Sequence, residues 1–139
     1  MHISATAAVA LLVQLFFVNE PSQANAAQCE TVKTFDDLIR IVNMGMTLKR
    51  NEICFRPFRL IKATASVLVL NRPISLRCDK LLNNEKCIIE GGGSHITIAG
   101  GNAKVKLDGF TFTGATQGAV RVTRTSRETH SLTGCEFVR

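Results

Sequence analysis

The sequence predicts an all-β fold, a parallel β-helix in which short strands stack one coil on the next. After residue 52 the chain consists of short β-rich segments bounded by Gly, Asn and Pro, and such segments are shorter than the strands of most sandwiches. The pattern Leu-x-Gly-x-x-Phe occurs at Leu107–Phe112 and again at Leu132–Phe137. A repeat at this interval is typical of a solenoid, and short strands with turn glycines favour a β-helix over a helical repeat.

Further strand pairs extend the repeat at nearly the same interval. Cys87–Ile89 aligns with Phe110–Phe112, Ile74–Leu76 aligns with Ile96–Ile98, and Ile96–Ile98 aligns with Ala119–Val122. Alternate residues of a strand point to one face, so two inward stacks are expected in the coils at 53–138. The first holds Ile74, Leu76, Ile96, Ile98, Val120 and Val122, and the second holds Ile89, Phe110, Phe112, Cys135 and Phe137.

Residues 34–45 predict an amphipathic helix. Thr34 can cap its N-terminus with Asp37 in the first turn, and Gly45 can end it. An apolar stripe at i, i+3, i+4 and i+7 must cover other apolar groups; it consists of Phe35, Leu38, Ile39 and Val42. We expect this helix to cap the N-terminal end of the solenoid. No such cap follows Phe137, and the chain stops at Arg139, which predicts a C-terminally truncated β-helix.

Residues 1–26 predict a signal peptide, and residues 27–139 the β-helix domain. The apolar stretch from Ile3 to Val18 is short and mixed for a membrane span, and Ala24-Asn25-Ala26 offers a small-x-small cleavage site. The n-region, Met1-His2, lacks Lys and Arg, so an uncleaved membrane anchor is the alternative. Cleavage predicts a secreted, extracellular protein without a stable membrane span.

The chain is basic. Its net charge is +6, and cleavage after Ala26 would remove one acid, Glu20, and no Lys or Arg, which gives +7. A basic secreted protein suits an acidic polysaccharide, an anionic cell wall or an anionic membrane surface. The basic residues are scattered from Lys33 to Arg139, so nucleic acid is not an expected partner.

All five cysteines lie beyond the predicted cleavage site, where an oxidising compartment favours pairing. Cys78 and Cys87 flank a polar loop, and Cys29 with Cys54 is the next simplest pair, which leaves Cys135 unpaired. Zinc is the competing interpretation. No Cys-x-x-Cys occurs and the histidines are distant in sequence from the cysteine pairs, so no metal site is expected.

The stretches Cys87–Ser94, Leu107–Gly114 and Gly134–Phe137 resemble the right-handed parallel β-helix superfamily, which has the pectin-lyase-like fold. The resemblance covers roughly residues 30–138 and is closest to the secreted, cysteine-containing members. It implies a right-handed coil. Enzymes of this fold include pectate lyases, which use calcium, and polygalacturonases, which need clustered aspartates.

Such chemistry requires carboxylates stacked on one outer face. The alignment instead places Glu90 beside Thr113 and Val138, Glu136 beside Thr111 and Ile88, and Asp108 beside Thr133. We therefore expect no catalytic residues and no cofactor, with calcium relevant only if the chain belongs to a lyase. His95 and His130 each neighbour a Ser, but adjacent strand residues point to opposite faces, so surface histidines are expected.

Outward basic residues are the remaining candidates for a binding site. They are Arg77, Lys104, Lys106, Arg121 and Arg124, and guanidinium and ammonium groups suit the carboxylates or sulfates of an anionic glycan. The sequence thus favours a secreted non-catalytic β-helix that binds or organises extracellular or cell-wall polysaccharide. The alternative is the N-terminal portion of a pectate-lyase-like or polygalacturonase-like enzyme.

Overall fold

The computed structural model describes residues 29–79 and 85–139, which contain one helix followed by eleven strands. The helix is α2 (Phe35–Thr47). The strands are β1 (Glu52–Phe55), β2 (Phe58–Ile61), β3 (Leu68–Leu70), β4 (Ile74–Cys78), β5 (Cys87–Glu90), β6 (Ile96–Ile98), β7 (Val105–Asp108), β8 (Phe110–Thr113), β9 (Val120–Val122), β10 (Ser131–Thr133) and β11 (Glu136–Val138).

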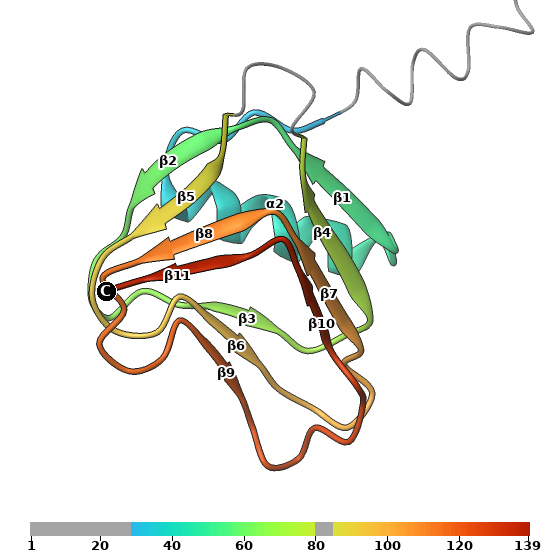
Figure 1. Cartoon of the computed structure of the whole chain (residues 1–139). Coiled ribbons are helices and arrows are strands. Elements are labelled where there is room, and N and C mark those ends of the chain that lie inside the picture. The colour runs from blue at the N-terminus through green and yellow to red at the C-terminus, as the bar shows by residue number, and fades with distance from the viewer. Residues whose placement is uncertain (1–28, 80–84) are drawn as a thin grey trace, which may run out of the picture.

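The strands form three parallel sheets. Sheet A has the order β1-β4-β7-β10, sheet B the order β2-β5-β8-β11, and sheet C the order β3-β6-β9. Each strand pairs with the strand three places further along the chain, so β1–β3, β4–β6 and β7–β9 are three successive coils and β10 and β11 begin a fourth. Figure 1 looks along this stack and shows its roughly triangular outline. The predicted β-solenoid is confirmed.

The pairing confirms most of the predicted register. Leu132 lies beside Leu107, Phe137 beside Phe112, Cys87 beside Phe110, and Ile96 beside Val120.

One predicted alignment is wrong. Ile74 pairs with Val105 in sheet A, whereas Ile96 pairs with Leu68 in sheet C. The strands of sheets A and C have similar alternating apolar patterns, so they are easily confused in the sequence. The segment between β4 and β5 also lengthens the second coil. The number of residues between Ile74 and its true partner, Val105, is therefore larger than the repeat length seen in the sequence. In addition, β2 and β10 were not among the predicted strands.

The core lies inside the triangle. Most predicted inward residues are buried, including Ile74, Leu76, Ile89, Ile96, Ile98, Phe110 and Phe112. In sheet B the inward column from Leu60 through Ile89 and Phe112 ends on Phe137, whose ring lies 5.3 Å from that of Phe112 between centroids. Val122 and Phe137 remain 52% and 56% exposed, because no described strand lies beyond the last coil.

Helix α2 lies across the end of the stack formed by the first coil (Figure 1). It starts as predicted, with the Thr34 hydroxyl accepting a hydrogen bond of 3.0 Å from the Asp37 N–H. Its inward face buries Phe35, Leu38 and Val42 in the common core. The predicted capping role is therefore confirmed, and the helix seals apolar groups that the first coil would otherwise expose.

The predicted end of the helix at Gly45 is wrong. Gly45 is buried inside α2, and the helix continues to Thr47 with Leu48 as its C-cap. A Cβ at residue 45 would lie 2.5 Å from Cδ1 of Ile53. Helix α2 therefore packs closely on β1 at this glycine, and the residue with a left-handed backbone that follows the helix is Lys49, with φ of 56°.

Two disulfides join coil segments. Cys29 is bonded to Cys54 and Cys78 to Cys87, the two pairs that the sequence suggested, and Cys135 is a free thiol. Cys78 and Cys87 are buried and close the corner between sheets A and B. Glu30 forms a parallel bridge with Phe55, so the segment after Cys29 covers the outer edge of β1.

The predicted signal peptide lies outside the described residues. Within 29–79 and 85–139, α2 is too short and too polar to cross a membrane, and no other helix is present.

Candidate functional site

Basic side chains collect at the edge where the strands of sheet A begin. The segments before β1, β4 and β7 stack there, with the Ser75 N–H donating to the Asn51 carbonyl (2.8 Å) and the Ile74 N–H to the Lys104 carbonyl (3.1 Å). We call this edge the basic corner. It consists of five exposed residues, Lys49, Arg50, Arg72, Lys104 and Lys106.

Two adjoining hollows are present at the basic corner. One, of about 220 Å³, is lined by Lys49, Arg50 and Arg72, and the other, of about 300 Å³, by Lys104 and Lys106. Asn51 and Pro73 line both hollows, so the two form one shallow surface that crosses successive coils. The corner therefore brings together cations from three successive coils, Arg50 before β1, Arg72 before β4 and Lys104 before β7.

Carboxylates neutralise cations elsewhere more than they do here. Arg77 pairs with Glu52 at 3.1 Å, Arg59 with Glu90 at 3.1 Å and Lys86 with Glu136 at 3.0 Å. At the basic corner, by contrast, the closest approach of a carboxylate is that of Glu30 to Arg50, at 3.7 Å.

The other four cations of the basic corner have no carboxylate partner among the described residues. These four cations are Lys49, Arg72, Lys104 and Lys106. The Arg72 guanidinium donates to the Met46 carbonyl at 3.2 Å, which orients the side chain without neutralising it. Four of the five positive charges can thus attract an anion.

The structure brings together two of the five basic residues that the sequence singled out. Lys104 and Lys106 line the same hollow. Arg77 lies on the outer face of sheet A but is paired with Glu52. Arg121 belongs to β9 in sheet C, and Arg124 lies in the segment between β9 and β10.

Lys49, Arg50 and Arg72 were not among the binding residues predicted from the sequence. The available signal was positional, because a basic residue closely precedes each of the first three strands of sheet A: Arg50 before β1, Arg72 before β4 and Lys104 before β7. The erroneous alignment of Ile74 with Ile96 assigned these segments to different columns, so they could not be recognised as one corner.

The carboxylate columns follow the predicted register. Glu90 pairs with Thr113, Glu136 with Thr111, and Asp108 with Thr133. The strand pairs of the described region place no two carboxylates side by side. The described outer faces therefore do not hold the stacked acids of a lyase or hydrolase site.

One serine lies within hydrogen-bonding distance of a histidine, but these two residues, Ser126 and His130, are not neighbours in the sequence. The Ser126 hydroxyl lies 2.8 Å from Nε2 of His130, and Nδ1 of His130 accepts a hydrogen bond of 3.2 Å from the Val105 N–H. Because Nδ1 is the acceptor, neutral His130 carries its proton on Nε2 and donates it to Ser126. In this tautomer the ring cannot remove the hydroxyl proton, as a nucleophilic serine would require.

The expectation that His95 lies on the surface is wrong. His95 is 0% exposed and points into the core beside Phe112, with 5.8 Å between ring centroids. It precedes β6, where its backbone pairs with both adjacent coils: its N–H donates to the Ala119 carbonyl and its carbonyl accepts from the Leu68 N–H. Strand alternation does not explain this burial, because the neighbouring Ile96 is also buried; the inward-facing ring instead has its Nε2 2.7 Å from the carbonyl oxygen of Gly91.

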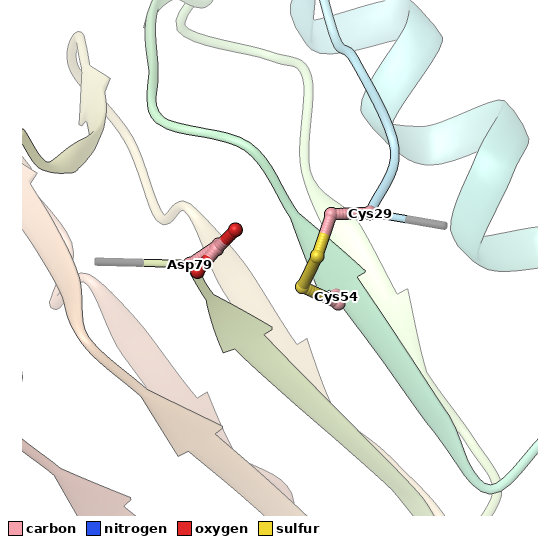
Figure 2. Close-up of side chains that lie close together, drawn as sticks. All are labelled: Cys29, Cys54 and Asp79. Atoms are coloured by element: carbon pink, nitrogen blue, oxygen red, sulfur yellow. A yellow bond between two sulfur atoms is a disulfide. The ribbon is translucent and has the colours of Figure 1, made fainter. Parts of the chain in front are cut away.

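Asp79 lies beside the Cys29–Cys54 disulfide, as Figure 2 shows. The two sulfurs and a carboxylate oxygen of Asp79 all lie within 4.8 Å of one another. Metal binding by cysteine requires thiolates, and here the two sulfurs are bonded to each other. The cluster therefore does not offer a metal site in the disulfide-bonded protein.

Comparison with known proteins gives no relative for this chain: no family model matches it, and no match is found among curated proteins or solved structures.

Proposed function

We propose that this protein is a secreted, non-catalytic β-solenoid that binds an acidic polysaccharide through its basic corner. The observation that carries the proposal is the stack of exposed cations over adjoining hollows, most of them without a carboxylate partner. Ammonium and guanidinium groups suit carboxylate and sulfate. A linear polyanion lying along the corner would meet cations from successive coils, and several weak contacts would add to useful affinity.

The surrounding polar groups also suit a glycan. Asn51 lines both hollows and Ser75 lines the larger one, and both side chains can exchange hydrogen bonds with sugar hydroxyls. The hollows are open, which suits one face of a polymer better than an enclosed small molecule. Two disulfides support the extracellular part of the proposal, since such bonds persist in oxidising compartments.

Retention on a column of immobilised polygalacturonate or dextran sulfate tests the proposal, with neutral dextran as the reference matrix. We expect Lys104→Ala/Lys106→Ala to weaken binding about tenfold or more, because each cation near an anionic surface contributes about 1 kcal/mol. Added salt should weaken binding of the wild type in the same direction.

The matched control is Arg59→Ala/Arg121→Ala, which removes the same charge from sheets B and C. Equal losses in the two double variants would mean that net charge, not the basic corner, governs retention, and would overturn the proposed site. Equal retention of the wild type on neutral and acidic matrices would overturn the function.

Secretion has a separate test in the intact mass of the exported protein after thiol alkylation. We expect a chain that begins at Ala27 and carries one alkylated cysteine, Cys135. A retained N-terminus with five alkylated thiols would contradict an extracellular role.

A further inference from the structure

His95 is a buried imidazole with one bonded and one unbonded nitrogen. Its Nε2 lies 2.7 Å from the carbonyl oxygen of Gly91, while Nδ1 is buried and has no hydrogen-bond partner. A carbonyl oxygen only accepts, so Nε2 must carry the hydrogen and Nδ1 the lone pair. The folded protein therefore fits one form of this side chain, the neutral Nε2–H tautomer.

The surroundings of the ring oppose a second proton. Phe112 of β8 contacts the ring, and the segment after β2 contributes Lys62, which is only 5% exposed. The Lys62 ammonium donates to the Gly92 carbonyl at 2.6 Å and lies 5.9 Å from the centre of the Phe35 ring. Among the described residues, Lys62 is the charged group whose field acts on His95, and it has the wrong sign to stabilise an imidazolium.

The net effect of these surroundings is to lower the pKa of His95 below its usual value of 6.5. Burial is the largest cause, the hydrogen bond to Gly91 opposes it, and the positive charge of Lys62 lowers the pKa further. The folded-state pKa is thus below that of the unfolded chain. The contribution of neutral His95 to stability is fully present above pH 6.5 and is lost as the pH falls towards the folded-state pKa.

The position of His95 gives this titration a structural consequence. Its backbone N–H and carbonyl connect the second coil to both the third coil and the first. A proton on Nδ1 would add a second buried cation near Lys62 and an N–H without an acceptor. We propose that His95 is an acid-sensitive latch, whose protonation opens the corner between sheets B and C and loosens the coils on either side.

Equilibrium unfolding in urea between pH 7.5 and 5.0 tests the latch. His95→Gln keeps an amide N–H for the Gly91 carbonyl and cannot be protonated. We expect the unfolding equilibrium constant of the wild type to rise, relative to that of His95→Gln, by up to about tenfold for each pH unit below 6.5, as uptake of one proton requires. The control His130→Gln should retain the wild-type pH dependence, because His95 is still present.

Parallel pH profiles for the wild type and His95→Gln would overturn the proposal. If His95→Gln does not fold, NMR titration of the imidazole nitrogens of the wild type decides instead. A His95 ring that stays neutral and Nε2-protonated in the folded protein down to pH 5.5 supports the latch. A ring that titrates near pH 6.5 while the protein stays folded excludes it.

Discussion

Gly93 allows the backbones of two neighbouring coils to approach each other closely. Its φ is +74°, and a Cβ at this position would collide with the carbonyl oxygen of Thr64 in the first coil. The backbone N–H of Gly93 also donates a hydrogen bond of 2.8 Å to the Thr116 hydroxyl in the third coil. The corner between sheets B and C is therefore built around the absence of a side chain.

We expect Gly93→Ala to lower the free energy of unfolding by at least about 1–2 kcal/mol from the left-handed backbone alone, with a further loss because the coils must separate. The matched control is Gly101→Ala, where the nearest atom to the new Cβ would be the Thr125 carbonyl oxygen at 3.6 Å. Its effect should stay within about 1 kcal/mol. Similar urea midpoints for the two variants would contradict this account of the corner.

Single residues also set the limits of sequence-based prediction. The glycine run at 91–93 was recognisable as a corner from its composition. The burial of Lys62 and His95 was not, because polar residues are ordinarily exposed and their partners here are backbone carbonyls. Backbone acceptors leave no mark in the sequence, so a buried polar side chain that depends on them cannot be anticipated.

The capping helix is the element whose formation depends most on local signals. The Thr34 cap and the two acids of the first turn, Asp36 and Asp37, were predictable because they act within one helical turn. The end of the helix was not, because Gly45 lies inside α2, where it packs closely on Ile53, a residue outside the helix.

The hydrogen bond at the start of the helix can be tested directly by substitution of Thr34. Thr34→Ala should lower the free energy of unfolding by about 1 kcal/mol, since the Asp37 N–H loses its acceptor. The control is Thr47→Ala at the other end of α2, whose exposed hydroxyl donates only to the Asn43 carbonyl. Urea unfolding should separate the two variants. An equal effect would mean that the hydrogen bond at Thr34 does not stabilise the helix start.

The stack as a whole should lose its amide protection in order. Strands in the middle coils, such as β4, β5, β7 and β8, have a paired strand on each side, whereas β10 and β11 are paired on one side. In a solenoid each coil is stabilised by its neighbours. Native-state hydrogen exchange should therefore be slowest for the middle coils and fastest for β10 and β11. Uniform protection across all coils would show that the molecule opens as a single unit.

For the whole molecule, the sequence predicted the solenoid architecture but only part of the basic corner. Alternation within the strands and the recurrence of the Leu-x-Gly-x-x-Phe pattern are both visible in the sequence, and they identify parallel stacking. The basic corner depends on which segments share a column, and that depends on coil length. Lys104 and Lys106 could be named as candidates, but Arg72 could join them only once Ile74 was paired with Val105.

The unequal coils have a consequence for how this molecule can change. Sheet A keeps its pairing both across the shorter connection from Glu52 to Ser75 and across the longer one from Ile74 to Val105. The strands of sheet A thus stay paired although the connections between them differ in length. Doubling the length of a loop costs only about 0.6 kcal/mol of closure entropy. Foreign peptides grafted between Cys78 and Cys87 would be held at both ends by the disulfide, which makes this corner a natural place for new recognition sequences to be acquired or engineered.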